Sequence, residues 1–179
     1  PDLLSRNGGD IPVLLLDGEE LIGAKQNRVL NLSILAPANK TITIPVSCVE
    51  AGRWSRRTPE FQSSGRSMYA RGRAAKVAQV SMSMRSGHSR SDQSEVWRDI
   101  SEKGERMSVA SETQAMSDIY ESRGEKLDTY LTEFSVTENQ IGAMFEIDGA
   151  VAGLDLFDRE GTLLRVLPKL VAATVSLSL

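Results

Sequence analysis

Residues 30–46 read LNLSILAPANKTITIPV, and this stretch decides the fold class. Apolar and polar residues alternate from Leu30 to Ile34, and the alternation resumes from Thr41 to Val46 after a turn at residues 37–39. A period of two is typical of strands with one buried face. Two such strands joined by a short loop predict an antiparallel pair.

Further strands are predicted on both sides of this pair. The apolar run of residues 11–16 lies between turn signals and predicts a short buried strand, and the alternation at residues 80–84 predicts another. The polar stretch of residues 62–67 between them is predicted to be a loop. Near the C-terminus, residues 142–147 and 151–156 flank an Asp-Gly pair, which is typical of a type I′ hairpin.

Helical spacing begins at Asp92, where Glu95 three residues later is typical of a capping box. A second helical region covers residues 113–134 with a break near Gly124, and a last helix begins near Thr162 and is bent or ended by Pro168. The order of strands, helices, hairpin and helix predicts an α+β fold, mostly an antiparallel sheet or sandwich with two or three packed helices. We expect one domain over residues 1–179: β-rich to 90, helical over 91–134, and a hairpin plus helix over 135–179.

The bulk composition is ordinary for a globular domain, with 40% apolar and 25% charged residues in a chain of 179. One cysteine, Cys48, excludes an intrachain disulfide and favours a cytoplasmic location. No run reaches the roughly 20 apolar residues of a membrane span, so we expect no membrane partner. The net charge of −3 gives no indication of a nucleic-acid partner.

Charge is divided unevenly along the chain. Residues 53–90 contain nine Lys or Arg and one acid, whereas residues 92–160 contain seventeen acids and six bases. The basic segment forms either an anion-binding face or a sheet that the acidic helices neutralise.

The first candidate site is a polar cluster between short strands, formed by Lys25, Gln26, Asn27 and Arg28. Lys and Arg hold phosphate or carboxylate groups, and the amides orient a polar ligand. On a flat strand, Lys25 and Asn27 point to one side and Gln26 and Arg28 to the other, so a bulge or loop is needed to bring all four together.

The second cluster combines a thiol, a carboxylate, a guanidinium and an indole in Cys48, Glu50, Arg53 and Trp54. Arg53 and Trp54 together suit an anionic or aromatic ligand. The structural alternative is that Glu50 pairs with an arginine, Trp54 covers the core and Cys48 is a small buried residue.

Candidate catalytic groups are Glu50, Cys48 and Asp155. A Cys48 nucleophile needs a base, and the single histidine, His88, lies forty residues away in a polar loop. One Cys and one His do not supply a zinc site, so no metal is expected. No Walker loop or Gly-x-Gly-x-x-Gly motif is present, and Ser64-Gly65-Arg66 is too short to predict a phosphate loop.

Several segments together resemble a known family. The resemblance is carried by VLLLDGEEL at residues 13–21, GAKQNR at 23–28, IPVSCVE at 44–50 with GRW at 52–54, SDQ at 91–93 with VW at 96–97, and GLDLF at 153–157. These segments resemble the ARG-and-Rhodanese-Phosphatase-superfamily-associated domain, formerly a family of unknown function. The resemblance implies association with ADP-ribosylglycohydrolase-like and phosphatase-like proteins, and through them with ADP-ribose, NAD or phosphorylated nucleotides. Members carry additional sequence before the position of Asp2, which implies that this chain is shortened at its N-terminus.

Three functions follow as hypotheses. The first is a domain that binds a small anionic or nucleotide-like ligand through Lys25 to Arg28, Glu50, Arg53 and Trp54. The second is a hydrolase of a nucleotide-derived substrate that uses Glu50 or Asp155, and the third is an interaction module that docks a protein partner. The sequence gives neither a cofactor nor the oligomeric state.

Overall fold

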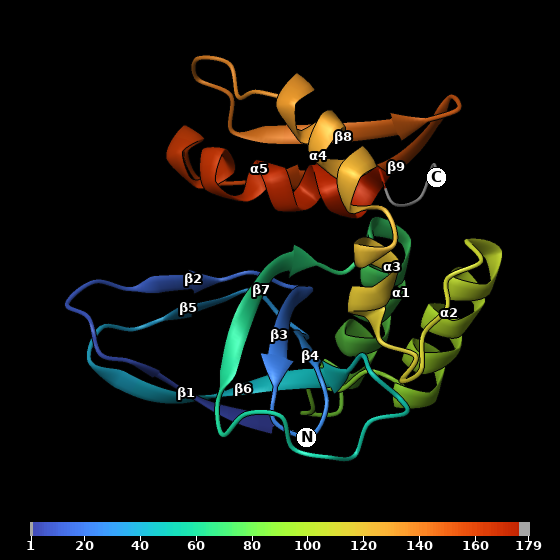
Figure 1. The fold of residues 1–179 in the computed structure, drawn as a ribbon. Coiled ribbons are helices and arrows are strands. Elements are labelled where there is room, and N and C mark those ends of the chain that lie inside the picture. The colour runs from blue at the N-terminus through green and yellow to red at the C-terminus, as the bar shows by residue number, and fades with distance from the viewer. Residues whose placement is uncertain (1, 176–179) are drawn as a thin grey trace.

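The computed structural model describes residues 2–175, apart from the side chains of residues 125 and 126, and shows an α+β fold (Figure 1). The strands in chain order are β1 (Asp2–Asn7), β2 (Val13–Leu15), β3 (Glu19–Gly23), β4 (Arg28–Leu30), β5 (Ile34–Ala36), β6 (Lys40–Cys48), β7 (Phe61–Ser67), β8 (Gly142–Ile147) and β9 (Ala150–Leu156). The helices are α1 (Ala70–Met84), α2 (Gln93–Arg106), α3 (Met116–Glu121), α4 (Gly124–Glu133) and α5 (Glu160–Val175). The described part therefore contains five helices rather than the two or three expected.

The largest sheet has the strand order β1-β6-β4-β3-β7, and every neighbouring pair in it is antiparallel. Two small antiparallel sheets, β2-β5 and β8-β9, complete the strands. In Figure 1 the large sheet lies at the lower left, α1 to α3 lie at its right, and β8, β9, α4 and α5 form a layer above. The predicted class, α+β with mostly antiparallel strands, is confirmed.

The main core joins Val29 of β4 and Val49, just after β6, to Ile100, Met116 and Leu163 of three different helices. Burial of these apolar side chains from both ends of the chain favours their packing together. The single-domain organisation itself stays a prediction. No helix among residues 2–175 has the length and apolar character needed to cross a membrane.

The strand pairing of residues 30–46 differs from the prediction. Leu30 ends β4 and pairs with Val46 of β6, whereas Ile34 begins β5, which pairs with β2. The chain leaves the sheet at Asn31, because the buried Asn31 amide donates to the Ser89 carbonyl and its oxygen accepts from Ser47. A single strand over residues 30–34 is therefore wrong.

Two assignments between residues 60 and 85 are also wrong. Residues 62–67 belong to strand β7, and residues 80–84 are the last turns of helix α1. In α1, Val80 and Lys76 are buried one turn apart, whereas Met82 and Met84 are exposed. An alternation of only three apolar residues does not distinguish a strand from a helix. The burial of Lys76 and Val80, four positions apart, is the spacing of a helix.

The predicted helix start at Asp92 and the predicted hairpin turn are confirmed. The Asp92 carboxylate accepts from the Ser94 and Glu95 backbone N–H groups at 2.9 and 3.1 Å, as an N-cap does. The Asp92 N–H donates to the Gln79 side-chain oxygen at 2.8 Å rather than to Glu95, so the reciprocal bond of a capping box is absent. The turn between β8 and β9 has Asp148 at φ 51° and Gly149 at φ 79°, as a type I′ turn requires. The region from 113 to 134 is two helices that meet near Gly124, and α5 continues through Pro168 to Val175.

Candidate functional site

A buried ion pair between Glu50 and Arg53 occupies the centre of the second predicted cluster. The two residues are 1% and 5% exposed, and Arg53 Nη2 lies 2.7 Å from Glu50 Oε2 while Nε donates to Oε1 at 2.8 Å. Glu50 also accepts from the Asn27 backbone N–H and the Thr113 hydroxyl, both at 3.0 Å. The carboxylate is therefore fully hydrogen-bonded from within the protein.

The remaining donors of Arg53 are also used within the protein. Arg53 Nη1 donates to the carbonyls of Ala24 and Ser55 at 2.6 and 3.0 Å, and Nη2 donates to the Asn27 side-chain oxygen at 3.1 Å. We call the group of Asn27, Glu50 and Arg53 the Glu50–Arg53 network. Its hydrogen bonds tie the turn at 23–27 to the end of β6, so it fixes the backbone of both predicted clusters.

The network also anchors the segment that leads into α3. Glu50 forms an isolated β-bridge with Ala115, and the Gly52 N–H donates to the Thr113 carbonyl at 2.8 Å. A side chain at Gly52 would approach the Thr113 backbone at 3.0 Å, so glycine permits this close contact. Burial raises the pKa of Glu50, but hydrogen bonds from Arg53, Asn27 and Thr113 outweigh it and hold that pKa below its ordinary value.

The other predicted ligand residues do not join this network. Gln26 and Arg28 form a separate group, in which Arg28 Nη1 donates to the Gln26 carbonyl at 3.1 Å and to its side-chain oxygen at 3.3 Å. Lys25 is exposed on the turn, and Trp54 is 67% exposed on the following loop. The structure therefore brings together Asn27, Glu50 and Arg53 and leaves the others apart.

The remaining catalytic candidates lie in settings without an evident role in chemistry. Cys48 is buried, which raises the pKa of its thiol, and no hydrogen bond joins it to the exposed His88. Asp155 of β9 is paired with Arg73 of α1 at 2.5 Å. Among the described side chains, no group of three or more His, Cys, Asp or Glu is placed to hold a metal ion.

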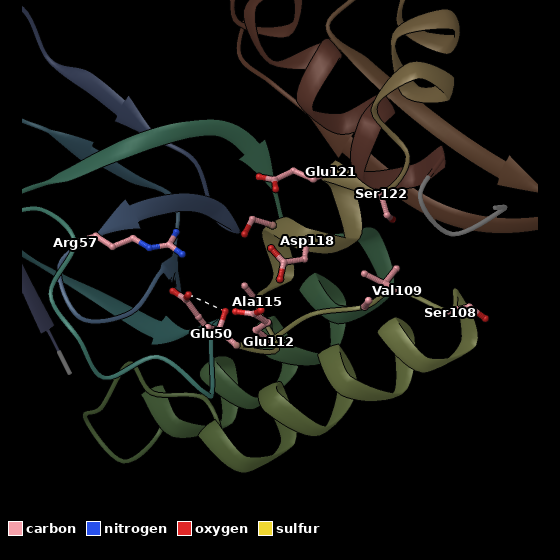
Figure 2. A pocket seen from close by; sticks show the side chains of 12 residues that line it. Glu50, Arg57, Ser108, Val109, Glu112, Ala115, Asp118, Glu121 and Ser122 are labelled. Carbon is pink, nitrogen blue, oxygen red and sulfur yellow. Dashed lines mark hydrogen bonds between the residues drawn. The ribbon is translucent and has the colours of Figure 1, made fainter.

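Two adjoining hollows open beside the Glu50–Arg53 network. The α3 hollow, of about 510 Å³, lies between the Arg57 loop and helix α3 and is lined by Glu50, Arg57, Ser108, Val109, Ala110, Glu112, Thr113, Ala115, Ser117, Asp118, Glu121 and Ser122 (Figure 2). The β7 hollow, of about 260 Å³, is lined by Ile22, Gly23, Asn27, Arg57, Thr58, Gln62, Ser64, Arg66, Ser117 and Glu121. Arg57, Ser117 and Glu121 line both, so the two hollows are continuous neighbours.

The two hollows differ in charge. In the α3 hollow, Glu112, Asp118 and Glu121 outnumber the single cation Arg57. In the β7 hollow, Arg57 and Arg66 face one acid, Glu121, whose carboxylate already lies 3.3 Å from Arg66 Nη1. Figure 2 shows the Arg57 guanidinium extending toward Glu50 and Asp118, and no described carboxylate forms a salt bridge with it.

A buried carboxyl lies on β3, opposite the bulged part of β7 that lines the β7 hollow. Glu20 of β3 is 0% exposed, and neither of its carboxyl oxygens has a hydrogen bond of normal geometry among the described residues, although the Ser64 hydroxyl acts on it as a weak donor. Burial raises the pKa of Glu20 to about 7, against smaller lowering effects of Ser64 and Arg66. Glu121 and Glu50 add to the rise, so this carboxyl changes its protonation state near neutral pH.

Sequence reasoning did not select the residues that face the hollows. Arg57 and Arg66 were counted in the basic segment, and Ser64 was placed in a loop, because strand β7 carries a bulge that its sequence did not reveal. Glu20 had one signal in the sequence, its position next to Leu21 and Ile22 in a predicted strand region. A carboxylate on a buried strand face is unusual.

Comparison with known proteins gives one match. The sequence profile described as ARG and Rhodanese-Phosphatase-superfamily-associated Protein domain matches residues 1–179. No curated protein and no solved structure matches the chain.

Proposed function

Because the chain belongs to the family of ARG and Rhodanese-Phosphatase-superfamily-associated Protein domains, we propose that it binds a phosphorylated, nucleotide-derived ligand of the ADP-ribose or NAD type in the two hollows. The observation that carries the proposal is Arg57, a cation shared by both hollows with no salt bridge to a described carboxylate.

The division of charge supports this class of ligand. Arg57 and Arg66 in the β7 hollow suit a phosphate group, since guanidinium groups hold phosphate oxygens through paired hydrogen bonds. The carboxylates of Glu112 and Asp118 in the α3 hollow accept from hydroxyl groups, as a ribose would supply. A molecule with an anionic end and a hydroxyl-rich end matches both, and about 510 Å³ is a usual size for a small-molecule site.

In this proposal the Glu50–Arg53 network forms the wall of the hollows rather than the ligand contact. Asn27 and Glu50 line them, while Arg53 has its donors engaged by the protein. Lys25, Gln26, Arg28 and Trp54 line neither hollow, so this proposal does not use the ligand contacts predicted for them from the sequence. The hydrolase alternative gains no support from Glu50 or Asp155, because arginines already hold both carboxylates.

The test is thermal unfolding of the whole chain with ADP-ribose, NAD, AMP, ribose or inorganic phosphate. A ligand at about 100 times its Kd stabilises the folded state by about 2.7 kcal/mol, which raises the midpoint by several degrees. Arg57→Ala is expected to lose this rise, whereas Arg85→Ala, an exposed arginine at the end of α1, keeps it. No rise with any of these compounds would contradict the proposal.

A second candidate function is protein docking on the β8–β9 hairpin. Its outer surface exposes four large apolar side chains: Met144, Val151, Leu154 and Leu156. Adjoining exposed apolar residues on a two-stranded sheet are typical of interaction surfaces. This candidate becomes the leading one if the small-molecule test gives no rise.

A further inference from the structure

The β7 hollow has an unusual floor, formed where strand β7 bulges away from β3. Glu19 pairs with Ser67 and Leu21 with Ser63, so two steps along β3 oppose four along β7. Gly65, at φ 75°, supplies the left-handed backbone that this bulge requires. Bulges re-aim side chains, and this one places Ser64 and Arg66 in the wall of the hollow.

Glu20 lies opposite the bulge. It shares a face of β3 with Ile22, which is two residues away and lines the β7 hollow. The charged groups that act on it come from three parts of the chain: Arg66 of β7, Glu121 of α3 and Glu50, two residues after β6. Ser64, which also acts on Glu20, is in contact with the hollow, so Ser64 connects the buried carboxyl with the ligand space.

A carboxyl that is 0% exposed and has no hydrogen-bond partner costs folding free energy. An uncharged residue of similar size at this position would avoid the cost. Buried groups of this kind beside a cavity are typical of functional sites, where the protonation state is used.

We propose that Glu20 couples ligand binding in the β7 hollow to proton uptake, with Ser64 as the group between them. This inference rests on the proposed function. An anionic group held by Arg57 and Arg66 lies close to Glu20 and disfavours its ionised form. Binding therefore raises the pKa of Glu20, so at pH values around the pKa of the free and bound states each binding event takes up a fraction of a proton from solvent, at most one.

The ligand class follows from the same chemistry. A negatively charged phosphate group binds more tightly beside the neutral Glu20 carboxyl, whereas a cationic ligand would bind more tightly beside the ionised carboxylate. ADP-ribose is a suitable probe because each phosphate of its diphosphate carries one ester and one anhydride bond, so its charge does not change around neutral pH. The single histidine of the chain, His88, lines neither hollow.

The experiment is calorimetric titration of the full chain with ADP-ribose between pH 6 and pH 8, in two buffers of different ionisation enthalpy. For the wild type we expect the affinity to fall about fivefold over this range if binding raises the pKa of Glu20 from about 7 by about one unit, with net proton uptake at the upper end. Glu20→Gln is expected to bind without proton uptake and with an affinity independent of pH.

Ser64→Ala and Ser63→Ala form a matched pair. Ser64 lowers the pKa of Glu20, so its removal is expected to move the midpoint of the pH dependence to higher pH. Ser63 bonds to Glu19 at 2.7 Å and lines neither hollow, so Ser63→Ala is expected to leave the midpoint unchanged.

The outcomes separate the two proposals. If ADP-ribose does not bind the wild type at any pH, the proposed function fails and this inference fails with it. If it binds and Glu20→Gln shows the same proton uptake as the wild type, the coupling is overturned while the proposed function stands. Direct observation of Glu20 by carbon-13 NMR of its carboxyl gives a ligand-free check, and an ordinary pKa there also overturns the coupling.

Discussion

The Glu50–Arg53 network and the β7 hollow are neighbours with similar residues, but they differ in how fully the protein satisfies the hydrogen bonds of those residues. The network contains the buried Glu50, the buried Glu20 lies opposite the part of β7 that lines the hollow, and Asn27 belongs to both regions. Glu50 accepts hydrogen bonds from Arg53, Asn27 and Thr113, whereas Glu20 has none among the described residues.

This difference separates a structural role from a binding role. A network in which every donor has a partner contributes rigidity and has nothing left to offer a ligand. Unused donors such as Arg57, and an unpartnered carboxyl such as Glu20, retain their binding capacity. Residue types alone therefore do not locate a site, because the hydrogen-bond partners decide which arginine is available.

The largest expected effect is on stability, in the closed network. Arg53→Ala leaves Glu50 as a buried, uncompensated charge, and we expect a loss of about 3–5 kcal/mol in the free energy of unfolding. Urea denaturation measures this loss. The control is Arg56→Ala, an exposed arginine three residues along, which is expected to change stability by less than about 0.5 kcal/mol. An equally small effect for both variants would show that the network is not structural.

A smaller effect on stability is expected from Glu20, whose ionisation lowers the free energy of unfolding. Its pKa is about 7 in the folded protein and 4.5 for an ordinary glutamate, so the folded state binds the proton more tightly than the unfolded state between these values. Stability is then highest below about pH 4.5, falls as pH rises through this window, and levels off above 7, by about 3 kcal/mol in all.

Glu20→Gln removes the ionising group, so the difference in unfolding free energy between wild type and variant is expected to change across this window by that amount. Urea denaturation of both proteins at half-unit steps of pH measures the difference, from which the other titrating groups cancel. Parallel curves at all pH values would mean that Glu20 titrates in the ordinary range.

The smallest effect on stability is expected for Arg57→Ala. The Arg57 side chain is exposed and has no salt bridge with a described residue, so the change in unfolding free energy is expected to be within about 0.5 kcal/mol. Urea denaturation measures it beside the loss of ligand response. A loss of 2 kcal/mol or more would place Arg57 in the structural group with Arg53.

Features governed by neighbours in sequence could be predicted from the sequence. The Asp92 cap and the turn at Asp148-Gly149 depend on a few adjacent residues, and both are present. The α1 helix was missed because a short alternation at residues 80–84 fits a strand as well as a helix, and only packing against α2 and the core decides between them.

The hollows could not be predicted because they depend on contacts between distant segments. Glu20, Arg57, Ser64 and Glu121 come from four elements or loops, and the β7 bulge that aims Ser64 has only Gly65 as its local signal. The pairing of Glu50 with Arg53 was among the alternatives because the two are three residues apart. The hydrogen bonds from Arg53 to the carbonyls of Ala24 and Ser55 depend on the tertiary structure, and they complete the network.

Amide NMR of the nitrogen-15 labelled chain titrated with ADP-ribose compares the two regions most directly. The account predicts that the largest shift changes fall on Arg57, Ser64, Arg66 and Ser117, with the amides of Lys25, Arg28 and Trp54 nearly unchanged. Changes concentrated at Lys25, Arg28 and Trp54 instead would contradict it and move the binding site to the two clusters predicted from the sequence.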